Sequence, residues 1–428
     1  MAAPFRVIAS DEQGKMWDLR GWTPAVRSGV EYRPGQESDW IPAPEGTRLQ
    51  FLQGRCPLGW PKGSRFPEPA TRMDGGLAVA AQLPSGYTRT LLPAYERTGG
   101  VPYLPFFGYT AVAYRDGQPW VAALQSDSNP HWLPRHYSPA DLEARIAAHQ
   151  ERFPGNRVLD QLKICSLEYG CYNAQNIFLG RWEGAVPVSP ACNAECVGCI
   201  SQQPEGKPAS PQQRFVFVPS QQEIVELGLA HLKDDDSIYS FGQGCEGEPL
   251  LQARLIAGAV KSLRQQTSRG TIHLNTNASK PDGFKLVVEA GLDSVRVSLN
   301  SVLDQPYTAY YQPRGYTFAD LRRSIEVARA NGVLVSLNYL HMPGWNDRQQ
   351  EVEELVRFIN QLDVHMIQMR TLNIDPDMYV QAVPMPAGPA LGMPELVARL
   401  RKDCPRLVIG NHTLPKSRYG KQACKGEA

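Results

Sequence analysis

Three cysteines close together carry the most specific chemistry that this sequence can support. Residues 192–200 read CNAECVGCI, which places Cys192, Cys196 and Cys199 in a C-x3-C-x2-C pattern. Three thiolates on one short loop can hold three corners of a [4Fe–4S] cluster and leave one iron without a protein ligand. Two other interpretations stay open. The loop is compatible with a structural zinc site that takes a fourth ligand from elsewhere, or with three unrelated buried thiols.

The composition favours metal or redox chemistry over a disulfide framework. The chain has 428 residues and nine cysteines, and its 44 Lys and Arg residues nearly balance 43 Asp and Glu residues. Balanced charge gives no general attraction to nucleic acid. The N-terminus lacks the pattern of a secretory signal, and no apolar stretch approaches the ~20 residues that span a bilayer. We therefore expect a cytoplasmic protein with reduced thiols.

The cysteine loop must be positioned by strands that alternate with helices from about residue 183 onward. Capping boxes at Ser220–Glu223 and Thr317–Asp320 open two of these helices. Such alternation implies right-handed βαβ units and a parallel sheet. Six units are fewer than the eight of a closed barrel, so we expect an incomplete (β/α)6 parallel barrel, open at one side. The predicted strands are 185–189, 237–241, 271–276, 294–300, 333–340 and 365–372.

The rest of the chain has a different texture. Residues 1–182 are rich in turn residues and predict a β-rich or α+β domain, with a hairpin over 109–124 and a helix over 138–153. We divide the chain into this N-terminal domain, for substrate or an auxiliary metal, a barrel over 183–375 and a short C-terminal extension over 376–428. The outer two parts must cover some of the open side.

The cysteine loop directly follows the first predicted strand, which is where the reactive groups of parallel α/β folds lie. Here the sequence resembles the radical SAM superfamily over about residues 185–375, and Cys192, Cys196 and Cys199 match its cluster motif. The resemblance implies that S-adenosylmethionine (SAM) binds the open iron of an oxygen-sensitive cluster. One electron then cleaves SAM to methionine and a 5′-deoxyadenosyl radical, which abstracts hydrogen from a substrate.

Further strand ends resemble the SAM-binding motifs of the family. Gly247-Glu248-Pro249 is similar to its glycine-glycine-glutamate motif, although Glu246 replaces the first glycine. A second departure is Gly198, where the family usually has an aromatic residue near the adenine. Arg370 is a candidate for either the carboxylate of SAM or the substrate. The resemblance implies these SAM contacts: Gly247, Glu248, Thr276, Asn277, Ser298, Asn300, Asn338 and Arg370.

The substrate is not named by any motif. An open barrel admits a bulky substrate, and the proline-broken loop over 200–215 is expected to act as a lid. A peptide or protein is favoured. RNA and a small metabolite remain alternatives, as does a non-catalytic zinc or iron–sulfur module. The resemblance also implies a one-electron donor such as flavodoxin or ferredoxin.

Six cysteines lie outside the motif. We expect Cys56, Cys165 and Cys171 either to bind a second iron–sulfur cluster or iron, or to be buried structural thiols. Cys245 lies in the GQGCEGEP turn, where it is a hydrogen donor, a ligand or a small apolar filler. Cys424 is expected to be a tail cysteine.

Overall fold

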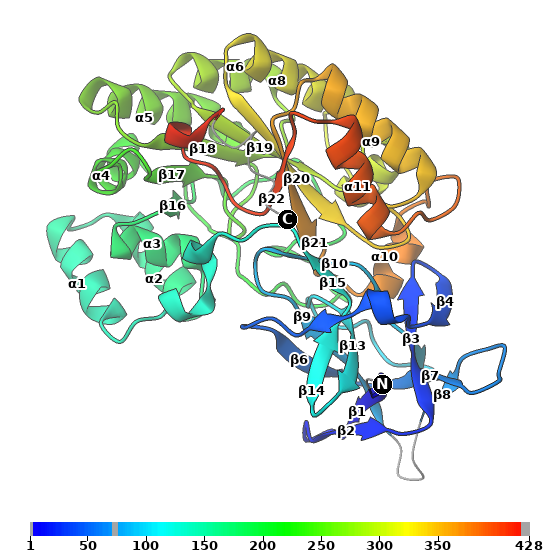
Figure 1. The fold of residues 1–428 in the computed structure, drawn as a ribbon. Coiled ribbons are helices and arrows are strands. Elements are labelled where there is room, and N and C mark those ends of the chain that lie inside the picture. The colour runs from blue at the N-terminus through cyan, green and yellow to red at the C-terminus, as the bar shows by residue number, and fades with distance from the viewer. Residues whose placement is uncertain (1–2, 71–75, 421–428) are drawn as a thin grey trace.

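The computed structural model describes residues 3–70 and 76–420, so Cys424 lies outside the described residues. An antiparallel β-domain is followed by three helices and a parallel sheet with helices on its outer side (Figure 1). The mixed α/β class and the incomplete parallel barrel are both confirmed. No helix in the described ranges combines the length and apolar character needed to cross a bilayer.

The N-terminal β-domain is built from two larger antiparallel sheets and one two-stranded sheet. The expected hairpin is present, and its Asp116-Gly117 turn has positive φ at both residues (51° and 82°), as a tight two-residue turn requires. The strands are β1 Val7–Ser10, β2 Met16–Leu19, β3 Trp22–Ser28, β4 Glu31–Pro34, β5 Ile41–Pro42, β6 Arg48–Leu52, β7 Arg55–Pro61, β8 Glu68–Pro69, β9 Leu77–Gln82, β10 Tyr87–Arg89, β11 Leu92–Pro93, β12 Tyr95–Arg97, β13 Thr110–Arg115, β14 Gln118–Val121 and β15 Ala123–Gln125.

Three helices connect this domain to the barrel: α1 Leu142–Arg152, α2 Arg157–Leu167 and α3 Tyr172–Leu179. The predicted helix over 138–153 is confirmed but begins at Leu142. Leu159 and Ile177 belong to the same hydrophobic core as the barrel strands, whereas the β-domain has smaller cores of its own. The helices therefore pack with the barrel, although the predicted boundary grouped them with the β-domain.

The barrel sheet contains seven parallel strands in sequential order, with the six predicted strands shifted by no more than three residues at either end. The strands are β16 Glu183–Val186, β17 Ile238–Phe241, β18 Thr271–Thr276, β19 Ser294–Leu299, β20 Leu334–His341, β21 Met366–Thr371 and β22 Val408–Gly410. The helices after β16 are α4 Gln221–His231, α5 Ala253–Gln266, α6 Pro281–Glu289, α7 Asp304–Tyr311, α8 Phe318–Ala330, α9 Gln349–Gln361, α10 Pro376–Ala382 and α11 Met393–Asp403.

The seventh strand, β22, corrects the expected count of six. It pairs in parallel with β21, so the C-terminal extension is part of the sheet. The chain then crosses the amino ends of the strands, where the Lys416 N–H donates to Thr271 Oγ1 at 2.7 Å. Thr413 meets Arg296 in the barrel interior at 3.4 Å. This segment therefore closes the end of the barrel opposite the cysteine loop.

Both edges of the barrel sheet contact the N-terminal region. At one edge, α3 packs on β16, and Asn176 Nδ2 donates to the Glu183 carbonyl at 3.0 Å. At the other edge, the Asn411 N–H just after β22 donates to Asp127 Oδ2 at 2.8 Å. Between the edges, fully buried Arg89 of β10 donates to the carbonyls of His341 (3.3 Å) and Leu372 (3.4 Å), at the ends of β20 and β21. The expectation that residues 1–182 cover part of the open side agrees with these contacts.

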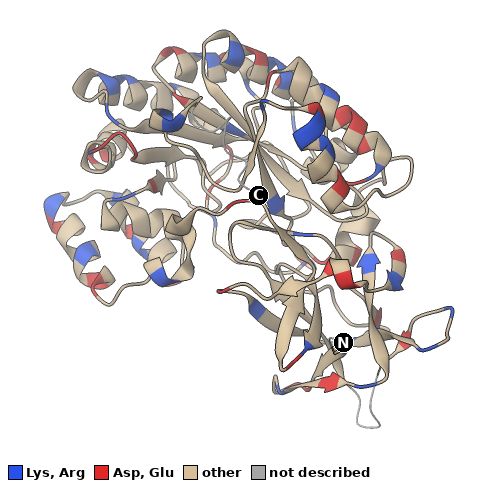
Figure 2. Cartoon of the chain, in the orientation of Figure 1, with Lys and Arg blue, Asp and Glu red and all other residues tan. Residues whose placement is uncertain are grey.

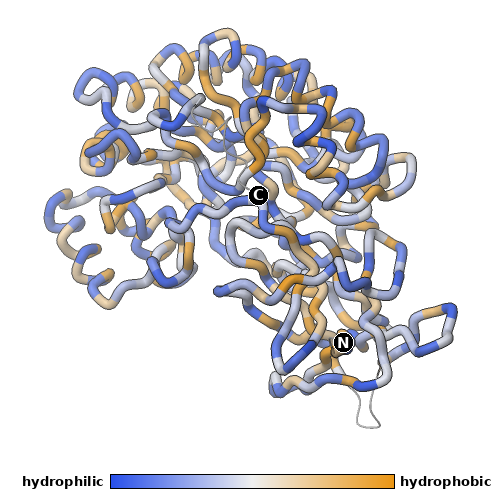
Figure 3. The backbone as a smooth tube through the Cα atoms, in the orientation of Figure 1, coloured by the Kyte–Doolittle hydropathy of each residue, from blue (hydrophilic) through white to orange (hydrophobic). Residues whose placement is uncertain are grey.

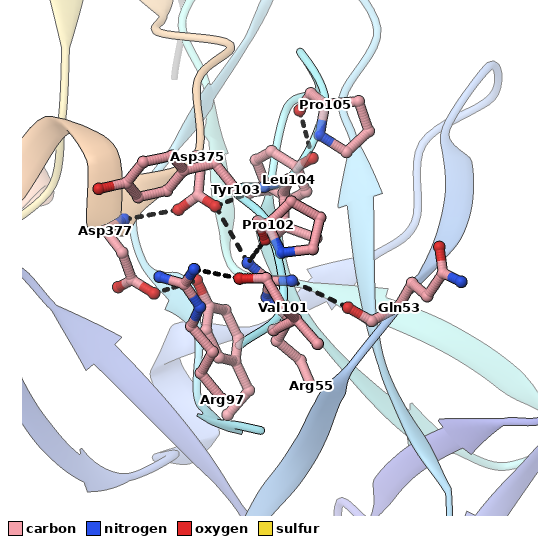
Figure 4. A network of polar contacts seen from close by, with 12 residues as sticks. Gln53, Arg55, Arg97, Val101, Pro102, Tyr103, Leu104, Pro105, Asp375 and Asp377 are labelled. Atoms are coloured by element: carbon pink, nitrogen blue, oxygen red, sulfur yellow. Dashed lines mark hydrogen bonds and ion pairs between the residues drawn. The ribbon is translucent and has the colours of Figure 1, made fainter. Parts of the chain in front are cut away.

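The β-domain is also fixed to the start of α10 by a buried polar network (Figure 4). Asp375 accepts hydrogen bonds from the Leu104 N–H at 2.6 Å and the Asp377 N–H at 2.7 Å, and it pairs with Arg55 at 3.3 Å. The side chains of Arg55 and Asp375 are 2% and 0% exposed. A buried carboxylate with several donors is well compensated, so this contact is specific.

The distribution of polarity follows this architecture. The strands at the centre of the barrel include the most hydrophobic segments of the chain (Figure 3). Charges of both signs are spread over the outer helices (Figure 2). This outer surface agrees with the near balance of charge in the sequence.

Candidate active site

The cysteine loop after β16 is held on one side by the end of α7. The Val197 N–H donates to the Tyr310 carbonyl at 2.9 Å, and the Glu195 N–H donates to the Tyr311 carbonyl at 3.0 Å. The Arg314 N–H donates in turn to the Asn193 carbonyl at 2.8 Å. These contacts fix the loop although it contains no regular helix or strand.

On its other side, the loop pairs with the turn after β17. The Gly247 N–H donates to the Ser189 carbonyl at 2.7 Å, and the Glu248 N–H donates to the Ala191 carbonyl at 2.8 Å. A Cβ at position 247 would lie 1.9 Å from the Ala191 oxygen. Only glycine allows the two backbone segments to approach this closely.

Glu246, the residue that departs from the family motif, fastens the base of the same loop. Its carboxylate accepts the N–H groups of Val188 (2.7 Å), Ser189 (2.8 Å) and Gln243 (2.7 Å). Burial raises the pKa of Glu246 to about 8, although these three donors oppose the shift. Its oxygens already have partners, which indicates a positioning role.

Glu248 links the turn after β17 to the end of β18. It accepts the Leu250 N–H at 2.9 Å, the Asn277 N–H at 2.8 Å and the hydroxyl of Thr276. Burial raises the pKa of Glu248 to about 7. Asn277 Nδ2 donates to Asn193 Oδ1 at 2.9 Å, so the cysteine loop is connected to this strand end as well.

All three motif cysteines line one cavity of about 370 Å³ at the carboxyl ends of the strands. Of the predicted SAM contacts, six line it with them: Gly247, Glu248, Thr276, Asn277, Ser298 and Asn338. These predicted contacts follow β17, β18, β19 and β20, and they lie around the thiols because the carboxyl ends of parallel strands meet at one edge of the sheet.

Two predicted contacts are not among the residues that line this cavity. Asn300 is fully buried, and its amide donates to the Pro306 carbonyl at 3.2 Å and to the Tyr379 hydroxyl at 3.3 Å. Arg370, on β21, donates to Gln368 Oε1 at 3.0 Å. Asn300 therefore connects helices in this structure.

Comparison with known families agrees with this geometry. Residues 186–359 match the model of the radical SAM superfamily. These residues form a radical SAM domain. This domain implies an enzyme that uses a [4Fe–4S] cluster and SAM. Its subfamily is not identified.

Three solved structures have related folds but low sequence identity to this chain. Methylornithine synthase (PylB) is 13% identical over 62% of this chain and 73% of its own, with a TM-score of 0.37. HydG, a maturase of the [FeFe]-hydrogenase, is 14% identical over 63% and 66%, also with 0.37. Streptococcus suis SuiB bound to its precursor peptide SuiA is 12% identical over 54% and 56%, with 0.32. Sequence identities and TM-scores this low support no conclusion on the substrate of this chain. A search of curated proteins finds no match.

The donor set of the radical SAM domain fits a cluster with three protein ligands. Cys192, Cys196 and Cys199 are the cysteines among the residues that line the cavity, and these residues include no histidine. Burial raises the pKa of Cys192 and, further, that of Cys196, where the neighbouring thiols add to the effect. Positive iron would offset this cost by binding the thiolates.

The loop over 200–215 lies against the cysteine loop, as a lid would. Arg214 Nη2 is 3.3 Å from Cys199 Sγ, and Gln203 Nε2 donates to the carbonyls of Val197 (3.2 Å) and Cys199 (3.0 Å). Arg214 thus brings a positive charge beside one of the three motif thiols. Sequence patterns did not single it out because an irregular loop has no period from which to read a contact.

The three cysteines expected either to bind a second metal or to be buried structural thiols do not form one group. Cys56 lies on β7 of the β-domain, whereas Cys165 and Cys171 lie on the α2–α3 segment, which is on a different side of the molecule (Figure 1). Cys165 instead interacts with the thiol of Cys245. The structure therefore does not bring Cys56 into one site with the other two. No group of three or more His, Cys, Asp or Glu within the described ranges is arranged around a single ion.

Four further residues around the cavity were not singled out in the sequence analysis. They are Asn173 of α3, Arg296 of β19, and Tyr310 and Tyr311 of α7. Arg296 had a detectable signal, because it alternates with Ser298 on the same face of a predicted strand. The other three enter the site only through packing of helices.

Proposed function

We propose that Cys192, Cys196 and Cys199 hold the [4Fe–4S] cluster and that the polar strand ends beside them bind SAM. The cavity that contains all three thiols and six expected SAM contacts carries this proposal. When bound, the cluster and SAM supply one-electron chemistry that initiates hydrogen abstraction from a substrate. In a reducing cytoplasm, a donor such as flavodoxin or ferredoxin would supply the electron that SAM cleavage requires.

The residues of this chain hold and shield the reacting groups. The backbone contacts from α7 and the turn after β17 keep the three thiols on one side of the cavity. The lid over 200–215, with Arg214 beside Cys199, limits access of water and oxygen to that side. Ser298 and Asn338, on neighbouring strands, offer polar groups to SAM.

The proposed substrate is a side chain of a peptide or protein, presented at the carboxyl ends of the strands. The separate β-domain, which contacts β20 and β21, offers a surface for such a partner. A small metabolite is the second candidate, because the N-terminal region contacts both edges of the sheet and so narrows the open side. Balanced charge disfavours RNA.

Anaerobic reconstitution with iron and sulfide tests the proposal. The protein should become brown, bind about four irons per chain and, with dithionite and SAM, release 5′-deoxyadenosine. Reduced flavodoxin should replace dithionite. A colourless protein with stoichiometric zinc and no 5′-deoxyadenosine would instead identify a structural metal module.

A further inference from the structure

Two arginines of the barrel interior do not have one carboxylate partner each. Arg296 lines the floor of the cavity, and its side chain is 14% exposed. The nearest carboxylate oxygen, Glu183 Oε1, is 4.0 Å from Nη2 and also accepts the Ser240 hydroxyl at 2.9 Å. Arg370, on β21, forms no ion pair within the described ranges. Two guanidinium groups therefore share one interior carboxylate.

A neutral amide stands between these arginines. Gln368 Oε1 accepts from Arg296 Nη1 at 2.8 Å and from Arg370 Nη2 at 3.0 Å, so one oxygen serves both guanidinium groups. Gln368 is fully buried, and its Nε2 has no partner. A buried donor without an acceptor is unfavourable, because it has lost its hydrogen bond to water. The interior thus has donors in excess of acceptors at this point.

Of the other groups that face the pair, none in the described ranges forms an ion pair with either arginine. His273 lies beside Arg296, and burial lowers its pKa to about 4, so it is neutral at pH 7. Asp127 is the other acid near Arg370, but its oxygens accept the N–H groups of Asn129 (3.0 Å) and Asn411 (2.8 Å). Burial, with Arg296 second, lowers the pKa of Arg370 to about 9, which leaves it charged at pH 7.

We propose that Arg296 and Arg370 together bind an anionic oxygen group of the substrate, a carboxylate or a phosphate. The fork of each guanidinium matches such groups, and the oxygen of Gln368 already accepts from both arginines, as one oxygen of a small anion would. This inference rests on the proposed function, because it assigns the substrate of the same barrel. It narrows the substrate to a small acid, a phosphate ester or an acidic residue of a peptide.

The anion belongs to the substrate rather than to SAM. Arg296 precedes Ser298 on β19 and so lies deeper in the barrel than the strand ends beside the thiols. Arg370 is not among the residues that line the cavity of the cysteines. The carboxylate of SAM remains the competing source, and the experiment separates the two.

The test uses the reconstituted, SAM-saturated full chain and measures its thermal unfolding with glutarate, inorganic phosphate or the neutral diamide glutaramide. Glutarate or phosphate should raise the unfolding temperature, and glutaramide should not. Arg370→Met should weaken the binding of whichever anion stabilises wild type by at least 10-fold. Arg370→Lys should retain part of the rise in unfolding temperature. Arg254→Met, at an exposed position of α5, is the matched control and should behave as wild type. Arg296→Met, measured on folded protein, should weaken the anion response in the same way.

Binding of SAM, measured by equilibrium dialysis, completes the test. The proposal expects an unchanged SAM affinity in Arg370→Met. A 10-fold loss of SAM affinity with an unchanged anion response would assign the arginine to SAM and overturn it. Equal anion responses in wild type and Arg370→Met, or no response in wild type, would also overturn it. Failure of wild type to release 5′-deoxyadenosine would contradict the proposed function alone, since the anion response is measured without turnover.

Discussion

The three motif thiols differ in their surroundings although they share one loop. Burial raises the pKa of Cys192 and Cys196, while Arg214 lies 3.3 Å from Cys199. Burial therefore makes the thiolate forms of two cysteines unfavourable, and binding of a metal would offset that free energy. Such an arrangement favours ligation over a role as ordinary core residues.

Substitution of a motif cysteine tests the ligand set. Cys192→Ala, Cys196→Ala or Cys199→Ala should each lose the bound iron and the release of 5′-deoxyadenosine. Loss of an outer partner of a metal ligand typically costs about 10–100-fold, so we expect loss of a ligand to cost more. Iron analysis and chromatography of 5′-deoxyadenosine measure both effects. Cys56→Ala, on β7, is the control, and wild-type turnover in any motif variant would contradict the assignment.

Glu246 should make the stability of the fold depend on pH. Its pKa in the folded protein is about 8, above the ordinary value of 4.5, so between these values the native state retains a proton that the unfolded chain releases. The stability from this group is present near pH 4.5 and is lost as the pH rises toward 8. Glu248, with a pKa of about 7, acts with the same sign.

Calorimetry of wild type and Glu246→Gln at about pH 5.5 and about pH 8 checks this dependence. The variant should be less stable by about 1–3 kcal/mol at the lower pH, because an amide cannot accept all three N–H groups. Its unfolding temperature should also fall less than that of wild type as the pH rises. Parallel curves would show that Glu246 does not titrate in this range.

At the scale of elements, the site depends on contacts between irregular segments. The cysteine loop has one neighbour in the end of α7 and another in the turn after β17, and both contacts are made by backbone groups. Backbone contacts fix the position of the cysteine loop and do not depend on which side chains the contacting residues carry. Strand order supplies the framework, and the turns supply the final placement of the thiols.

Gly247→Ala tests the close approach of the turn to the cysteine loop. The added Cβ would lie 1.9 Å from the Ala191 oxygen and 3.0 Å from the Cys192 nitrogen, so the loop must move. Overpacking of this kind costs about 1–3 kcal/mol. We expect lower stability in urea and reduced incorporation of iron. Gly99→Ala, where no atom lies within 4 Å of the new Cβ, should change neither; full iron content in Gly247→Ala would show that the loop adapts.

At the scale of the molecule, the β-domain and the barrel are connected by buried polar groups. Arg55 and Asp375 lie in different parts of the chain, and together with Leu104 they form the network in Figure 4. Arg89 adds a second buried connection to β20 and β21. The orientation of the β-domain over the carboxyl ends of the strands follows from these contacts.

Arg55→Met should weaken this connection strongly. Removal of one partner leaves Asp375 buried and unpaired, which typically costs about 3–5 kcal/mol. Unfolding in urea and limited proteolysis between the β-domain and α1 measure the effect, and Arg55→Met with Asp375→Asn should recover part of it. Arg135→Met breaks an ion pair with Glu45 whose side chains are 57% and 60% exposed, and it should cost less than about 1 kcal/mol. Equal costs for the two single variants would contradict the role of the buried pair.

The sequence alone determined the position of the thiols and most of the barrel. Periodic apolar segments and capping residues mark strands and helices locally, so the six predicted strands could be found without a structure. The resemblance to the family's motifs pointed to the cavity-lining residues Ser298 and Asn338. The tertiary structure decided which distant segments meet. A three-residue strand such as β22 forms only because β21 offers it an edge. Likewise, Cys165 meets Cys245 and not Cys56, and Arg214 meets Cys199, because packing of the folded chain, and no local pattern, brings these side chains together.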